Sequence, residues 1–262
     1  MQWLERFIRT SLRRLPDEQM AAARAAAACH DYATALALWE PLARQGVARA
    51  QNNIGACFAE GLGVERDAGL AQRWLSLSAA AGDPVGQRNL AALYFKGEGV
   101  SQDYDRAAQL YRAAAEQGDG PAQDMLSWML LEGAVIATDP AEARRWALEA
   151  AAQGIAASMT RLGMLYHHAL GVERDAAEAV RWWRQGAEAG DPDGQAMLGA
   201  ACHLGAGTPR DPLMAYVWLL RARDGGSSLA MPYFAVARAD LSPHQITEAE
   251  ARAAAPLSGP QP

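Results

Sequence analysis

The sequence predicts an all-α fold, specifically an α/α superhelical solenoid of 36-residue helix-loop-helix repeats. The first observation is a glycine that recurs every 36 residues, at Gly46, Gly82, Gly118, Gly154, Gly190 and Gly226. The second is an aspartate with the same period, at Asp31, Asp67, Asp103, Asp139, Asp175 and Asp211. The third is an alanine-rich composition that favours helices, without the alternating β-branched segments typical of strands. A fixed period of this length indicates a repeat architecture.

Each periodic residue has a physical role in the predicted repeat. We expect the aspartate to begin the second helix, because its carboxylate can accept from free backbone N–H groups in the first turn. Pro140 and Pro212 follow two of these aspartates, and proline suits the first helical position. We expect the glycine to end the same helix, because glycine takes a left-handed conformation at little cost.

Three further periodic positions predict the buried core. Alanine allows close helix contact and recurs at Ala35, Ala71, Ala107, Ala143, Ala179 and Ala215. Three residues later, on the same helical face, stand Leu38, Trp74, Leu110, Trp146, Trp182 and Trp218. The first helix contributes Ile54, Leu90, Leu126, Leu162 and Leu198. Because all three positions keep their residue type, we expect all of them to lie in the core.

The first complete repeat illustrates the predicted unit. Its first helix, helix A, is expected over residues 48–60, followed by a loop over 61–66 and by helix B over 67–81. The loop contains Gly61 and Gly63, a pair that recurs in later repeats. No strand precedes these glycines and no nucleotide-binding motif follows, so they predict turns and not a phosphate loop.

This pattern resembles a known repeat family. Between Ala50 and Trp74 the chain reads Ala50-x-x-x-Ile54-Gly55-x-x-Phe58-x-x-Gly61-x-Gly63-Val64-x-x-Asp67-x-x-x-Ala71-x-x-Trp74. The segment is similar to the Sel1-like repeat, a relative of the tetratricopeptide repeat with a longer loop between its helices. The second and third units depart from the pattern with Ala91 and Ser127 in place of the first glycine. Val135 and Ala169 replace loop glycines, and we expect those loops to bend differently.

The resemblance divides the chain into five parts. Residues 1–16 are predicted to form a basic amphipathic helix, and residues 17–46 a truncated opening repeat. Residues 47–227 hold five Sel1-like repeats. Residues 228–255 are predicted to form a partial repeat and a C-terminal cap helix, whose start is marked by a capping box at Ser242 and Gln245. Residues 256–262 are predicted to be a disordered tail.

The resemblance implies a scaffold or adaptor that binds a partner protein or peptide, in a bacterium. By analogy with the tetratricopeptide fold, helix A of each repeat is expected to line a concave groove. The positions expected to face it vary in type between repeats, and mix aromatic and apolar side chains with charged ones, as interface hot spots do. The alternative is that Trp128 and Phe95 simply pack between helices. The predicted partner-binding residues are Asn52, Glu60, Arg88, Phe95, Lys96, Asp124, Trp128, Leu131, Met164, His167, His168 and His203.

Other functional classes find little support in the residues. The net charge is −6, and the sequence lacks the clustered basic residues that a nucleic-acid binder needs to neutralise phosphates. No catalytic motif occurs, so we expect neither an enzyme nor a cofactor. Equivalent histidines in stacked repeats, such as His167 and His203, are too far apart to share a metal ion, so no metal is expected. The three cysteines, Cys29, Cys57 and Cys202, are interpreted as buried, reduced thiols.

Residues 1–15 leave two interpretations open. Apolar side chains recur at helical spacing, at Trp3, Leu4, Phe7, Ile8, Leu12 and Leu15, and four arginines lie among them. Such a segment can dock on an anionic membrane surface or on a partner. Alternatively, it folds back and covers the opening repeat, the interpretation that we favour. The expected location is the cytoplasm, or the periplasm if the start site is misassigned.

Overall fold

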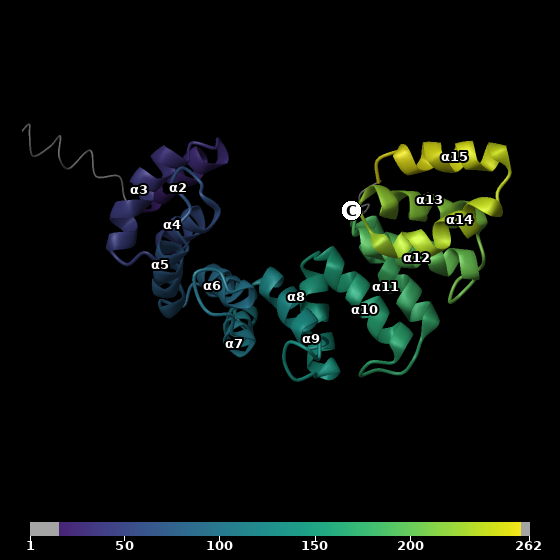
Figure 1. The fold of residues 1–262 in the computed structure, drawn as a ribbon, viewed down its shortest axis with the longest axis horizontal. Coiled ribbons are helices and arrows are strands. Elements are labelled where there is room, and N and C mark those ends of the chain that lie inside the picture. Colours follow the sequence, from purple (N-terminus) through teal and green to yellow (C-terminus); the bar gives the residue numbers. More distant parts are fainter. Residues whose placement is uncertain (1–15, 258–262) are drawn as a thin grey trace, which may run out of the picture. The chain divides into compact units, whose positions relative to one another are not determined.

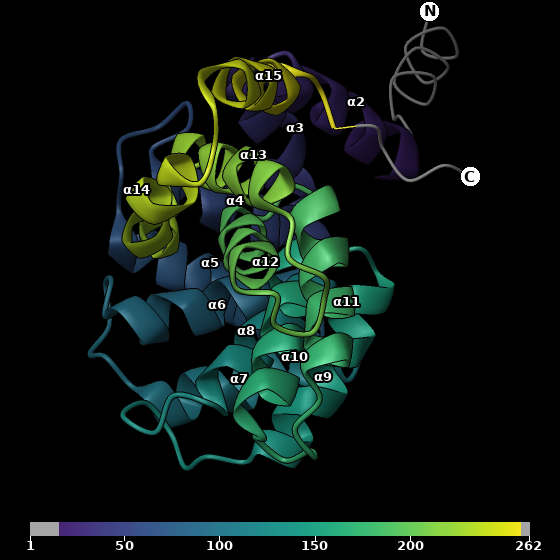
Figure 2. The ribbon, with the colours of Figure 1, turned by 90° about the vertical axis from the view of Figure 1, so that its right-hand side faces the viewer.

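The computed structural model describes residues 16–257, and the predicted N-terminal amphipathic helix therefore lies outside the described residues. The described chain is helical throughout and contains no strand (Figure 1, and turned by 90° in Figure 2). The helices are α2 (Pro16–Ala28), α3 (Tyr32–Arg44), α4 (Ala48–Glu60), α5 (Ala68–Ala80), α6 (Pro84–Lys96), α7 (Tyr104–Ala115), α8 (Gly120–Met129), α9 (Pro140–Ala152), α10 (Ala156–His168), α11 (Ala176–Glu188), α12 (Pro192–Leu204), α13 (Pro212–Asp224), the 3-10 turn η1 (Ser228–Ala230), α14 (Met231–Ala239) and α15 (Pro243–Ala254). The all-α repeat fold predicted from the sequence is confirmed.

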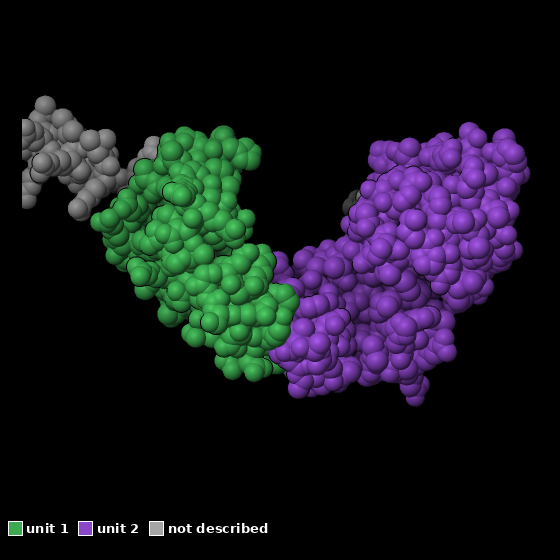
Figure 3. Space-filling model, viewed as in Figure 1, with its two compact units in different colours: residues 1–119 green, residues 120–262 purple. Residues whose placement is uncertain are grey.

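The chain forms two compact units, which Figure 3 colours separately. The first contains α2 to α7, and the second contains α8 to α15. Within each unit the even-numbered helices up to α12 are helices A, and the odd-numbered helices up to α13 are helices B. The helix predicted over residues 48–60 is α4, with the same bounds.

The periodic aspartates cap helices B as predicted. In all six, the carboxylate accepts from the backbone N–H three residues later; Asp67, for example, accepts from Leu70 at 2.8 Å. Such a cap contributes about 1 kcal/mol to helix stability. The periodic glycines that follow these helices all have positive φ, between 83° at Gly82 and 92° at Gly190. Both ends of helix B are therefore fixed by the sequence itself.

The periodic core prediction is correct for alanine and only partly correct for the tryptophan row, whose members mostly pack at the edge of the core. All six alanines have no exposed surface. In the row of Trp74, Trp146 and their equivalents, only Trp146 is buried, at 2% exposure, and the others are half-buried. The fully buried row stands one residue later, at Trp39, Leu75, Tyr111, Ala147, Trp183 and Leu219. Those positions lie four residues after the alanine, on the same face of the helix. The tryptophan row lies three residues after the alanine, at the edge of that face.

The expectation that Val135 and Ala169 change the bend of their loops is correct for the first loop and wrong for the second. Helix α8 ends at Met129, three residues before the point equivalent to the end of α4, so the third loop differs as expected. Ala169 ends α10 in the left-handed conformation with φ 57°, like the glycines it replaces, so the expectation of a different bend there is wrong. The left-handed conformation costs an alanine about 1–2 kcal/mol.

The C-terminal elements pack on the last repeat. Helix α15 begins at the capping box of Ser242 and Gln245 and lies against α13 (Figure 2). Leu241 and Ala249 join a buried cluster with Leu219 and Leu220 of α13. These residues cover apolar surface that the end of a repeat stack would otherwise expose.

The cysteines correct one expectation. Cys57 and Cys202 are buried as predicted, but Cys29 is exposed because it follows the last turn of α2. Burial raises the pKa of the Cys57 thiol to about 11 and also raises the pKa of Cys202. Within residues 16–257 no helix combines the length and the hydropathy that crossing a membrane requires.

Candidate functional site

Within each unit, successive helices A lie closer to one another than successive helices B do. In the first unit α4 contacts α6, and in the second α8 contacts α10 and α10 contacts α12. The helices B of these repeats make no comparably close contact with one another in the described chain. Helices that converge on one side and spread on the other give each unit an inner surface made of helices A. We call this surface the helix-A face, and it is where the predicted binding residues were expected.

One row on helices A joins neighbouring repeats to each other; it contains the predicted residues Asn52, Arg88 and Asp124, and also Thr160. The Arg88 guanidinium donates to the Asp119 carboxylate at 2.8 Å, and the Thr160 hydroxyl donates to the Asp191 carboxylate at 2.6 Å. Both acceptors stand 31 residues later and precede the next helix A. Only 7% of the Asp119 side chain is exposed. These bonds are shielded from solvent and hold consecutive repeats in register.

The other members of this row are also engaged within the fold. Asn52 is 4% exposed and accepts from the Asn89 amide at 2.8 Å. Asp124 accepts from the Ser158 hydroxyl and from the Arg161 guanidinium, both at 2.5 Å. The structure therefore places Asn52, Arg88 and Asp124 in contacts between repeats, which leaves little of them available to a partner.

The predicted apolar residues lie partly at the surface of the helix-A face. Phe95 is half-buried against Tyr104, with ring centroids 5.3 Å apart. Trp128 and Leu131 are half-buried in the second unit, and Leu131 packs on the cluster formed by α9 and α10. Met164 is half-buried against the cluster of α11 and α12. All four side chains are thus partly buried and partly open to solvent.

Two predicted histidines stand together at the end of α10. The His167 ring lies 4.7 Å from the His168 ring and 5.3 Å from the buried Trp183 ring. Burial, followed by the charges of His168 and Arg174, lowers the pKa of His167. At neutral pH the His167 side chain is therefore uncharged and half-buried, whereas the His168 side chain is exposed.

His203 takes part in a small charged cluster. Its Nδ1 lies 3.4 Å from Oδ2 of Asp240, which also receives a hydrogen bond from Arg210 at 2.5 Å. Asp240 follows α14, so the cluster ties α12 to the C-terminal elements. Glu60 and Lys96, the last two predicted residues, are exposed at the ends of α4 and α6.

A pocket near the opening repeat was missed by the sequence reasoning. It lies between α2 and α4 and is lined by Arg24, Trp39, Arg49, Asn53 and Ala56, among others. Arg49 and Asn53 are one turn apart on α4, a spacing that could have indicated a shared face. Arg49 also bonds to Asp83 at 2.7 Å. No group of three or more metal-ligating side chains occurs within the described chain.

The fold and this surface define a class of protein: an all-α repeat protein that presents one face of tandem helix pairs. The family model called Sel1 repeat matches residues 48–83, 84–119, 120–155, 156–191 and 192–227, in the register that the periodic glycines predict. The chain belongs to the Sel1 repeat family. Sel1 repeats generally act as scaffolds for protein–protein interaction and not as enzymes.

The comparison with solved structures gives one match that supports this assignment and a weaker one. A Sel1 repeat protein from Oxalobacter formigenes is 28% identical, with a TM-score of 0.79 over 92% of this chain and 99% of that chain. A Sel1 repeat protein from Klebsiella pneumoniae is 21% identical, with a TM-score of 0.49 over 76% of this chain and 97% of that chain. A search of curated proteins gives no match.

Proposed function

We propose that the protein is a non-enzymatic scaffold that binds a partner protein or peptide on the helix-A face. The observation that carries this proposal is the set of half-buried apolar side chains on that face, represented by Phe95, Trp128 and Met164. The equivalents of Trp128 and Met164 in the other three repeats are alanines, at Ala56, Ala92 and Ala200, whereas those of Phe95 are Ala59, Leu131, His167 and His203. Trp128 and Met164 therefore place large apolar groups at a position that alanine fills in the remaining repeats.

The physical character of this surface suits a protein partner. Binding hot spots are aromatic or apolar groups that are held rigid on one side and desolvated on the other when the partner binds. Met164 meets the first condition because it packs on the core of α11 and α12, Phe95 packs on Tyr104, and Trp128 is half-buried. Lys96 directly follows Phe95, and Glu60 is its equivalent in the preceding repeat; both are exposed and supply the polar rim that such interfaces have.

The experiment is quantitative affinity capture from cells of the native host. The test variant carries Phe95→Ala and Trp128→Ala, one change in each unit. The matched control carries Leu110→Ala and Trp182→Ala, which remove half-buried groups of similar size from helices B. We expect wild type and control to capture the same protein in equal amounts, and the test variant to capture at least tenfold less.

The stability of the variants is part of the design. Trp128 is half-buried, so its truncation should cost about 1–2 kcal/mol, roughly half of the 3–5 kcal/mol typical of a core tryptophan such as Trp146. Urea denaturation measures both values. Equal loss of capture by the two double variants, at equal stability, would place binding away from the helix-A face.

A further inference from the structure

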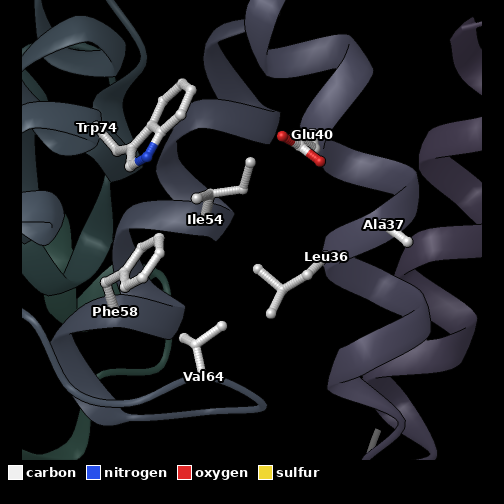
Figure 4. A pocket seen from close by; sticks show the side chains of 7 residues that line it. All are labelled: Leu36, Ala37, Glu40, Ile54, Phe58, Val64 and Trp74. Atoms are coloured by element: carbon white, nitrogen blue, oxygen red, sulfur yellow. The ribbon is translucent and has the colours of Figure 1, made fainter.

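A second pocket opens on the other side of α3, away from the helix-A face. Its volume is about 310 Å³, and it lies between α3, α4 and α5 in the first unit (Figure 4). In Figure 4 the side chains of Leu36, Phe58 and Val64 point toward one another across the gap. The remaining lining is largely apolar, and includes Ile54 and Trp74. Its one ionisable side chain is the Glu40 carboxylate.

The equivalent crevice three repeats later is covered by an arginine. Arg144 and Tyr166 occupy the positions of Leu36 and Phe58, 108 residues further on. The Arg144 guanidinium lies 5.9 Å from the Tyr166 ring centroid and donates to the Tyr166 hydroxyl at 3.1 Å. At the opening repeat Leu36 is too short to reach across, and Phe58 offers no hydroxyl. The apolar floor is therefore left uncovered at this repeat.

Residues 1–15 have the composition that this uncovered surface requires. Six apolar side chains recur at helical spacing, among four arginines and a single glutamate. The apolar groups match the apolar lining, and the arginines match the Glu40 carboxylate, which is exposed and also accepts from Arg44 at 2.6 Å. The pocket between α2 and α4 is a poorer match, because its lining includes the like charges of Arg24 and Arg49.

The chain also brings this segment to the pocket. Residue 15 is joined directly to Pro16, the first residue of α2, and α2 packs antiparallel on α3. The Gln19 amide donates to the Leu38 carbonyl at 3.0 Å, which sets the start of α2 beside the half of α3 that carries Glu40. Packed helices are about 8–10 Å apart. A segment of 15 residues spans about 22 Å even if fully helical, so it can pass around α3.

We propose that residues 1–15 of the same chain dock their apolar side chains in the pocket between α3, α4 and α5. The segment takes the covering role that Arg144 has in the later repeat, and caps the N-terminal end of the repeat stack. Because the pocket lies away from the helix-A face, this docking is independent of the proposed function and leaves that face free.

The direct test is site-specific photocrosslinking of the full-length chain. Benzoylphenylalanine is placed at Ala37, which is exposed at the rim of the pocket. The matched control places it at Arg181, the equivalent position in the second unit. We expect mass spectrometry to find a crosslink from position 37 to residues 1–15, and at least tenfold less from position 181.

The origin of the crosslinked segment decides the outcome. In a mixture of ¹⁴N- and ¹⁵N-labelled chains, docking within one chain gives crosslinked peptides of a single isotope. Mixed-isotope crosslinks would show that a second copy occupies the pocket, and would overturn the proposal. The proposal would also be overturned if position 37 crosslinks only to residues outside 1–15. The same holds if position 181 crosslinks to residues 1–15 with the same yield as position 37.

A second measurement uses a variant that closes the pocket. Leu36→Arg imitates Arg144, and Ala33→Arg adds the same charge to an exposed part of α3 outside the pocket. We expect trypsin to remove residues 1–14 about tenfold faster from the Leu36→Arg protein than from wild type or the Ala33→Arg control. Equal cleavage rates in all three folded proteins would contradict docking at this pocket.

Discussion

Gly163 provides a sharp test of how helices A and B pack within a repeat. A Cβ atom added at this position would lie 2.4 Å from two atoms of the Trp183 indole and 2.9 Å from the Ala179 carbonyl oxygen. Trp183 is 3% exposed, so its ring has no free space to enter. Overpacking of this kind costs about 1–3 kcal/mol, whereas replacing a helical glycine by alanine gains about 1 kcal/mol. We expect Gly163→Ala to destabilise the protein by about 1 kcal/mol, the central value of this difference.

A double-mutant cycle isolates the cause. In the third repeat the same two positions hold Ser127 and Ala147, so a larger residue on helix A stands opposite a smaller one on helix B. In a Trp183→Ala background the clash is removed, and Gly163→Ala should become neutral or stabilising by up to about 1 kcal/mol. Urea denaturation followed by circular dichroism measures all four proteins. If Gly163→Ala leaves the free energy of unfolding unchanged in the wild-type background, the reasoning is refuted.

Three further predictions follow from single residues. Ala169→Gly should raise the free energy of unfolding by about 1 kcal/mol, because it relieves a left-handed alanine; a lower melting temperature would contradict this. In the native protein at neutral pH, iodoacetamide should label Cys29 rapidly, while Cys57 and Cys202 should react only after denaturation. The pKa of His167, measured by NMR titration, should lie below the usual value of about 6.5. Since the unfolded chain then binds more protons, His167 should lower stability as the pH falls below about 6.5, and His167→Asn should weaken that dependence.

Most of the fold could be predicted because each structural requirement recurs in the sequence. Asp67 and its equivalents mark the start of every helix B, and Gly82 and its equivalents mark the turn after it. Burial was harder to predict at the edge of a helix face. Trp74 keeps its residue type in most repeats and yet is half-buried, because residue size and periodicity do not distinguish a position three residues from Ala71 from one four residues away.

The candidate site could be predicted only in part. The half-buried placement of Phe95 and Met164 agrees with an inward-facing row of helix A, but their binding role stays a prediction. Arg88 was assigned to a partner, whereas the structure pairs it with Asp119. That contact depends on how one repeat lies on the next, which a single repeat does not reveal. A spacing of 31 residues, shared by Arg88 with Asp119 and by Thr160 with Asp191, was the available signal.

The most direct test of the central claim is a calorimetric titration of the captured partner against purified proteins. The account predicts that Phe95→Ala, Trp128→Ala weakens binding by at least 30-fold, because hot-spot residues contribute about 2 kcal/mol or more. The Leu110→Ala, Trp182→Ala control should bind within twofold of wild type. A partner that binds the first variant as tightly as wild type, or that loses affinity only for the second, would contradict binding through the helix-A face.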